Sequence, residues 1–288
     1  MARVIVTLGG YPELVYFAGG ATGALLGDSI DQLPIKQHKI EASGPTRISY
    51  TVHETQLGLE YRFVPEGPKI EEKELAAFIR QIEKLEFDYI VATGSLPKNV
   101  PDDIYKSIAN IAIGKGARMI LDSSGPALKS ALDGSGVFLV KPSLAELEQL
   151  VGQSLDREQA GAEAIRLVRA GQAQNVAVSM DKDGALLANG NGLVHVAAPQ
   201  VTVRSSVGAG DSFVGAMTFA LASGIAVEEA FHFAVSAGSA AVMTPGSELC
   251  RKEDVEKLYR LEREKRGKND DENLQNMLFR QSNRADVL

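Results

Sequence analysis

The residues best suited to chemistry lie in one short glycine-rich stretch, Val207-Gly208-Ala209-Gly210-Asp211-Ser212. This stretch separates a β-like segment (196–204) from an apolar run (213–221) that has the character of a helix. Glycines let backbone N–H groups crowd around an anion, and the start of a helix adds partial positive charge. A carboxylate beside such an anion hole suits phosphoryl transfer, because the amides hold phosphate charge while the acid takes a proton from the attacking hydroxyl.

A purely structural interpretation of the same stretch remains open. An Asp at a helix start often serves as a cap or as a partner of the helix dipole. The spacing differs from the G-x-G-x-x-G dinucleotide fingerprint, and the Gly-Lys-Ser/Thr of a Walker A loop is absent from it. The stretch alone therefore leaves a structural role for Asp211, as a cap or a partner of the helix dipole, beside a role as an acid–base group.

Length, charge and hydropathy exclude several classes of protein. The 288 residues can bury one large core or two modest ones, and the net charge of −7 argues against a nucleic-acid partner. No apolar run approaches the ~18 residues that a membrane span requires, and the apolar N-terminal run is too brief for a signal peptide. The single cysteine, Cys250, is expected to pack in the interior. The sequence predicts a soluble, cytoplasmic protein.

Apolar periodicity predicts alternating helices and strands from residue 71 onward. The expected helices cover 71–85, 101–114, 143 onward and 157–170, and the expected strands cover 89–92, 118–121, 137–140 and 175–179. Such alternation indicates a parallel sheet covered on both faces, in which ligands collect at the carboxyl ends of the strands. Polar residues stand at these ends, at 93–95, 122–124, 141–142 and Ser179.

Residues 35–63 follow a different pattern. Polar and apolar residues alternate over 47–53 and 59–63, which predicts an antiparallel hairpin around Glu54-Thr55-Gln56. This β flap is a candidate lid or dimer surface. Beyond about Leu261 the chain is highly charged, which predicts a solvated helix or a disordered extension. We expect one domain over 1–266, with 35–63 contributing to the flap, and a charged tail over 267–288.

Several segments in a fixed order carry a resemblance to a known family. They are residues 17–23, 61–64, 94–97 (Gly-Ser-Leu-Pro), 122–125 (Asp-Ser-Ser-Gly), 141–146, 205–216 and 237–241. On these segments the chain resembles the ribokinase-like PfkB carbohydrate kinases from Met1 to about Arg260, and most of all their minor-type 6-phosphofructokinase branch. The resemblance implies a three-layer α/β/α fold with a small β lid.

The resemblance also implies roles for single residues. Asp211 matches the general base on the sugar hydroxyl, with the amides of Gly208, Ala209 and Gly210 as the anion hole. Arg47 and Ser95 match substrate-binding positions, although alone they would be an exposed hairpin charge and an ordinary turn residue. The matches to nucleotide-binding positions are Lys141, Ser143, Glu146, Ser179, Gly184 and Ser239. The matches to a monovalent-cation site, mainly through carbonyl oxygens, are Ser205, Val207, Ala241, Thr244 and Gly246. Catalysis would use ATP, Mg²⁺ and K⁺.

The N-terminal part departs from the family pattern. Members begin with a strand carrying a substrate-binding Asp, lid strands and a Gly-Gly loop ending in Asn, whereas Met1-Ala2-Arg3 matches the start of the following helix. We expect this loss to remove sugar contacts, part of the flap and a strand of the central sheet, with an uncovered edge as the result. Val4-Ile5-Val6 has the local character of a strand, where the family has helix.

The nucleotide and cation segments depart as well. Ser143 replaces the Asn of the Lys-Pro-Asn-x-x-Glu pattern and forms a capping-box sequence with Glu146, so that Glu146 serves the helix, Mg²⁺ or both. Asp181 stands where the nucleotide loop usually has Gly, and a carboxylate there would repel ATP phosphates unless it points away or meets a cation. Glu248 replaces a basic residue beside the cation site.

The resemblance implies an ATP-dependent kinase that converts fructose 6-phosphate to fructose 1,6-bisphosphate, as a homodimer formed through the flap and without nucleic-acid or membrane partners. Tagatose 6-phosphate and fructose 1-phosphate remain alternative substrates. A chain without catalytic activity that binds nucleotide or sugar phosphate, or a gene fragment, is the alternative from another class.

Overall fold

The computed structural model describes residues 1–57, 59–134, 136–267 and 286–287, and it divides into two compact units. The first unit comprises Met1–Pro12, Glu86–Ser95 and the described residues from Asp102 onward. The second unit comprises the described residues of Glu13–Leu85 together with Leu96–Pro101. The chain thus leaves and re-enters the first unit twice.

The first unit is built on a mixed sheet. Its parallel strands are β5 (Tyr89–Thr93), β6 (Arg118–Asp122), β7 (Val137–Val140) and β8 (Ala173–Ser179), and β9 (Ala185–Asn189) and β10 (Gly192–Val196) continue it in antiparallel fashion. All four residues of β7 are buried, as in a sheet that is covered on both faces. The predicted parallel α/β arrangement is confirmed, because the short apolar runs are those that form its central strands.

A short strand closes the other side of this sheet. In β11 (Asp286–Val287), Val287 pairs in parallel with Tyr89 of β5. On its other side β11 pairs in parallel with Tyr11 and Pro12, the first two residues of β1 (Tyr11–Ala18). Along these residues the uncovered edge expected from the sequence is therefore not seen between β5 and β1.

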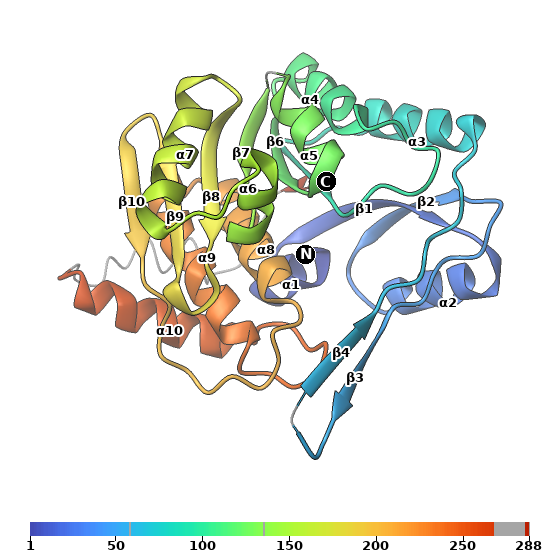
Figure 1. Cartoon of the computed structure of the whole chain (residues 1–288). Helices are drawn as coiled ribbons and strands as arrows, with labels where there is room; N and C mark the ends of the chain where they lie inside the picture. Colours follow the sequence, from blue (N-terminus) through green and yellow to red (C-terminus); the bar gives the residue numbers. More distant parts are fainter. Residues whose placement is uncertain (58, 135, 268–285, 288) are drawn as a thin grey trace. The chain divides into compact units, whose positions relative to one another are not determined.

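Helices cover both faces of the first unit's sheet. Figure 1 shows α4 (Ile104–Gly114), α5 (Gly125–Leu132), α6 (Leu144–Val151) and α7 (Arg157–Arg169) over one face, with α8 (Ala209–Ala222) and α9 (Val227–Ala241) behind the strands. α8 and α9 pack together, and these two helices carry the largest fully buried rings, Phe219, Phe231 and Phe233. Because this core holds α8 on both sides, the position of its first turn is fixed by packing.

The apolar run near the N-terminus forms a helix, α1 (Ala2–Leu8), and the strand suggested by Val4-Ile5-Val6 alone is wrong. Val4, Ile5 and Leu8 recur at helical spacing and are all buried. α1 packs against α8 so closely that a Cβ on Gly215 would lie 2.8 Å from the Cβ of Val4. Tertiary packing on α8 thus overrides the β propensity of the run.

The β-like segment expected over residues 196–204 is also wrong, because the strand ends at Val196. Pro199 has no N–H to donate to a ladder, which makes a sheet position unfavourable at that point. Further on, the Arg204 amide donates instead to the Val242 carbonyl (2.7 Å), so this loop is held by another loop.

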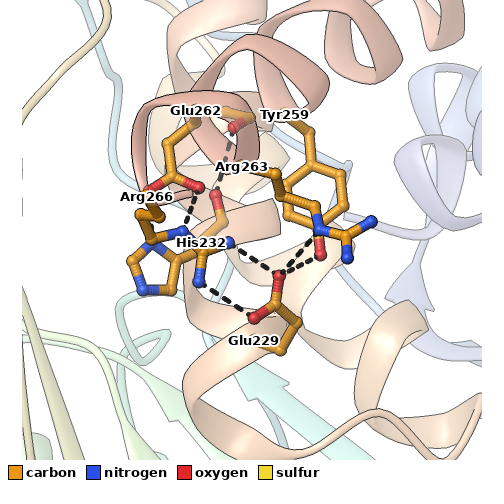
Figure 2. A network of polar contacts seen from close by, with 7 residues as sticks. Glu229, His232, Tyr259, Glu262, Arg263 and Arg266 are labelled. Carbon is orange, nitrogen blue, oxygen red and sulfur yellow. Dashed lines mark hydrogen bonds and ion pairs between the residues drawn. The ribbon is translucent and has the colours of Figure 1, made fainter. Parts of the chain in front are cut away.

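The charged residues 262–265 form the last turn of α10 (Lys252–Lys265), so a helix is confirmed there. Glu264 and Lys265 are exposed as expected, but Arg263 is buried because α10 packs on α9. Figure 2 shows the polar network between these helices, in which Arg266 donates to both oxygens of Glu229 at 2.7 and 3.0 Å. Tyr259 donates to Glu229 at 2.5 Å, and His232 Nδ1 lies 2.8 Å from Glu262. The rest of the predicted tail, 268–285 and 288, lies outside the described residues.

The second unit combines a strand pair, two helices and a hairpin. Residues 13–18 of β1 pair in parallel with β2 (Lys36–Glu41), alongside α2 (Gly20–Asp31) and α3 (Glu72–Lys84). The antiparallel hairpin consists of β3 (Tyr50–Glu54) and β4 (Leu59–Phe63). The predicted hairpin is confirmed, but it begins at Tyr50, and residues 36–41 of the expected flap pair with β1 instead.

Candidate active site

The glycine-rich stretch forms a tight turn that starts α8. Gly208 is the N-cap, with φ +84° and ψ 0°, a left-handed conformation that favours glycine. A side chain there would also meet Leu249, since a Cβ would lie 2.8 Å from Leu249 Cδ2. The first amides of a helix have no acceptor within it, and of Gly208–Gly210 only Ala209 donates to another described residue, Ser206 O at 3.5 Å. These amides are available for an anion.

The carboxylate of Asp211 lies at this helix start without capping it. Gly208 occupies the cap position of α8, and no side-chain cap is formed there by the described residues. The Asp211 side chain is 51% exposed, and its Oδ1 lies 3.9 Å from the Met1 amino nitrogen. The structure therefore excludes the cap for Asp211. As an acidic residue in the first turn of α8 it is placed to interact with the helix dipole, and its acid–base role stays a prediction.

A buried ion pair lies beside the same turn. Lys141, just after β7, places Nζ 3.1 Å from Oδ1 of Asp122 at the end of β6, and the two side chains are 6% and 19% exposed. A Cβ built on Gly210 would lie 3.9 Å from this Nζ, so the ammonium faces the first turn of α8. Burial raises the pKa of Asp122, the Lys141 ammonium lowers it, and the charges of Glu146 and Asp211 raise it again.

The sequence analysis predicts no role for Asp122, although Asp122 belongs to a segment that carries the family resemblance. Its position could have indicated a role, because Asp122 ends a strand that neighbours the strand before Lys141. The carboxyl ends of adjacent parallel strands meet at one edge of a sheet. The structure brings Asp122, Lys141, Gly210 and Asp211 together there.

The capping box at the start of α6 is confirmed. Glu146 Oε2 accepts the Ser143 amide at 2.7 Å, and Ser143 Oγ accepts the Glu146 amide at 3.2 Å. Because the charge of Glu146 also acts on Asp122, its carboxylate belongs to the electrostatics of the site as well as to the helix. A further role for Glu146 toward a metal stays a prediction.

The positions predicted to bind nucleotide beyond α6 lie in three further elements of the first unit. Ser179 ends β8 and donates its amide to the Pro142 carbonyl at 3.0 Å, beside Ser143. Gly184 has φ +88°, and a Cβ there would lie 2.0 Å from the Val196 carbonyl oxygen, so this turn admits only glycine. On α9, Gly238 precedes Ser239, and its Cβ position would be 3.4 Å from the Ala209 carbonyl oxygen. Their nucleotide contacts stay predictions.

Two loops bring the expected cation ligands together. The Arg204 amide bonds to the Val242 carbonyl at 2.7 Å, which joins the segment of Ser205 and Val207 to that of Ala241, Thr244 and Gly246. The Ala241 carbonyl oxygen already accepts two bonds from Thr244, from its amide at 3.1 Å and from its hydroxyl at 2.7 Å. Since a carbonyl has two lone pairs, ligation there would require Thr244 to release one of them.

The two expected substrate-binding residues lie in different units. Ser95 follows β5 in the first unit and is exposed, next to Gly94, whose amide donates to the Asp122 carbonyl at 3.0 Å. Arg47 lies in the second unit, where it is exposed and its Nη1 is 3.5 Å from the Pro65 carbonyl oxygen. Both roles stay predictions.

Known proteins share this arrangement over most of the chain. The model of the family described as pfkB family carbohydrate kinase matches residues 1–254. The ATP-dependent 6-phosphofructokinase isozyme 2 of Escherichia coli is 38% identical over 261 residues, which cover 90% of this chain and 84% of that protein. The chain belongs to the pfkB family of carbohydrate kinases.

Other pfkB kinases agree in sequence and in fold. The 1-phosphofructokinase of Bacillus subtilis is 34% identical over 84% of this chain and 78% of its own length. The crystal structure of phosphofructokinase-2 from Escherichia coli in complex with potassium superimposes with a TM-score of 0.87 at 37% identity, over 91% of this chain and 85% of that one. The ribokinase of Arabidopsis thaliana, with a TM-score of 0.68 at 20% identity over 90% and 85%, shows the fold alone. The ribokinase-like fold expected from the sequence is confirmed.

Proposed function

We propose that this pfkB kinase is an ATP-dependent fructose-phosphate kinase that phosphorylates the C1 hydroxyl of fructose 6-phosphate. The observation that carries the proposal is the half-exposed carboxylate of Asp211, which does not cap its helix and stands in the first turn of α8, the turn that the Lys141 ammonium also faces. The similar proteins named above act, by their names, on fructose phosphates. They support the substrate class.

Different residues of the chain have different roles in the phosphoryl transfer. Asp211 accepts the proton of the attacking hydroxyl, whose oxygen forms the bond to the γ-phosphorus as the bond from that phosphorus to ADP breaks. The amides of Gly208–Gly210 and the Lys141 ammonium hold the charge on the phosphate oxygens. Because they are fixed by the helix start and by the ion pair with Asp122, little reorganisation is needed during transfer.

The donor set fits nucleotide-bound Mg²⁺ better than a metal held by the protein alone. Among the described residues there is no group of three His, Cys, Asp or Glu side chains that could hold a metal. Glu146 and Asp122 are the carboxylates that would hold Mg²⁺ against the ATP phosphates, where it would neutralise their charge. For K⁺ we propose the carbonyls of the two joined loops around Ser205 and Thr244, in line with the potassium complex of the similar protein.

We also propose that the hairpin forms a homodimer. One face of β3 and β4 carries five apolar side chains that are each 45–54% exposed: Tyr50, Val52, Leu59, Tyr61 and Phe63. An unpaired two-stranded sheet with such a face is stabilised by covering it. Tyr61→Glu should reduce the mass in solution to the 30.7 kDa of one chain, whereas Thr51→Glu on the opposite face should not. Equal masses for wild type and Tyr61→Glu would refute the dimer.

No described helix of this chain is long and apolar enough to cross a membrane.

The function is tested by ADP release from Mg-ATP in K⁺ buffer, with fructose 6-phosphate, fructose 1-phosphate, tagatose 6-phosphate and glucose 6-phosphate as acceptors. We expect turnover that depends on the acceptor and is fastest with fructose 6-phosphate. A faster reaction with fructose 1-phosphate or tagatose 6-phosphate would correct the substrate and keep the kinase. A folded protein that binds ATP and turns over none of the four would favour a binding protein without catalytic activity.

A further inference from the structure

Two buried hydroxyls converge on one carbonyl in the turn that precedes Ser95. Tyr105, in the first turn of α4, donates to the Gly94 carbonyl oxygen at 2.7 Å. Ser123, just after β6, donates to the same oxygen at 3.0 Å. The two donors are 6% and 5% exposed, whereas Gly94 and Ser95 are exposed. The turn therefore faces solvent on one side, and on its other side two buried hydroxyls bind its carbonyl oxygen.

The backbone of Gly94 is fixed at both polar atoms. Its carbonyl oxygen has two lone pairs and receives two donors, and its amide donates to the Asp122 carbonyl at 3.0 Å. Gly94 has φ +104°, and a Cβ there would meet no described atom within 4 Å, so the glycine serves backbone conformation rather than close packing. These hydrogen bonds therefore also restrict the position of the next residue, Ser95.

The hydroxyl of Tyr105 is a permanent donor. Burial raises its pKa to about 12, so it keeps its proton at neutral pH. α4 contacts both β5 and β6, which fixes the ring relative to the strands on either side of the turn. The bond thus joins a rigid helix to an exposed loop.

The same contacts tie the turn to the phosphate side of the site. Asp122 receives the Gly94 amide on its main chain and binds the Lys141 ammonium with its side chain at 3.1 Å. We propose that Tyr105 and Ser123 are positioning residues, which hold the Gly94–Ser95 turn against Asp122 so that Ser95 meets the sugar phosphate at a fixed distance from Lys141. This inference rests on the proposed function, and it adds two residues to which the family resemblance gives no role.

The test compares Tyr105→Phe and Ser123→Ala with Tyr259→Phe. Tyr259→Phe is the matched control, because it also removes a buried tyrosine hydroxyl. That hydroxyl donates to Glu229, in the network between α9 and α10, and not to the Gly94 turn. Loss of one positioning hydrogen bond should raise the KM for fructose 6-phosphate by roughly three- to tenfold, with the KM for ATP changed by less than about twofold. Deuterium uptake by a peptide spanning residues 93–97 should be faster in Tyr105→Phe and unchanged in Tyr259→Phe.

Each outcome decides the inference. Unchanged uptake at 93–97 in Tyr105→Phe would overturn it, as would an equal rise of both KM values or the same change in Tyr259→Phe. If Tyr105→Phe does not fold, Ser123→Ala is judged by the same two measurements. Absence of turnover in the wild type would refute the proposed function instead, and deuterium uptake would still show whether Tyr105 holds the turn.

Discussion

Substitution of Lys141 by Met tests how the site balances its charges. Methionine keeps much of the apolar stem of the lysine and removes the ammonium that lies 3.1 Å from Asp122. The carboxylate is then left mostly buried, with the charges of Glu146 and Asp211 acting against it. Removing one partner of a buried ion pair costs about 3–5 kcal/mol, and the 19% exposure of Asp122 favours the lower end, about 3 kcal/mol at pH 7.

The loss of stability in Lys141→Met should grow as the pH rises. Burial already raises the pKa of Asp122 in the wild type, and removal of the ammonium, which lowers it, raises it further. A carboxyl whose folded pKa exceeds its unfolded value contributes stability below the unfolded pKa, and this contribution is lost as the pH rises toward the folded pKa. The unfolding free energy of Lys141→Met should thus fall as the pH rises from about pH 4, and it should fall more than that of the wild type.

The assay is urea unfolding followed by circular dichroism, since the chain has no Trp. Lys141→Met should lie about 3 kcal/mol below the wild type at pH 7 and less far below it at pH 4.5. The double variant Asp122→Asn/Lys141→Met should recover most of the loss at pH 7, because it removes the unpaired charge. Equal losses at both pH values, or a double variant no more stable than the single one, would refute this account of the ion pair.

Three other perturbations have defined outcomes. Ser143→Ala should lower the unfolding free energy by about 1 kcal/mol in the same assay, whereas Ser143→Asn keeps a cap and should not. Gly184→Ala should weaken ATP binding in a calorimetric titration and lower Tm, because its Cβ would lie 2.0 Å from a carbonyl oxygen, while Gly190→Ala, whose Cβ would meet no described atom within 4 Å, should change neither. The raised pKa of Tyr105, about 12 against an ordinary 10, means that its contribution to stability is present below pH 10 and lost between pH 10 and 12. Alkaline unfolding should therefore show a loss of up to about 3 kcal/mol in the wild type that is absent in Tyr105→Phe.

Much of the fold could be predicted because its signals are local. Strand β7 is a run of four apolar residues, and α6 begins with a capping box that the structure reproduces atom by atom. The glycine turn that starts α8 also follows from residue types at fixed spacing.

Other features depend on partners that are distant in sequence. The local sequence Val4-Ile5-Val6 favours a strand, but these residues form a helix because they pack on α8. Arg263 lies in a charged segment that predicts solvent exposure, but it is only 5% exposed because α10 packs on α9. Asp122 acquires its role only because β6 and β7 are neighbours in the sheet. Tyr105 looks like one aromatic residue in an amphipathic helix, and only the fold places its hydroxyl on Gly94.

The central claim is that Asp211 removes the proton from the sugar hydroxyl, and turnover of Asp211→Asn tests it most directly. Asn keeps the size and polarity of the side chain and cannot act as the base, and Asp28→Asn, at an exposed position of α2, is the matched control. With saturating Mg-ATP and fructose 6-phosphate, we predict that kcat of Asp211→Asn falls by about 10²–10⁴-fold with little change in either KM, and that Asp28→Asn behaves as the wild type. A kcat for Asp211→Asn within about tenfold of the wild type would contradict the assignment of Asp211 as the general base.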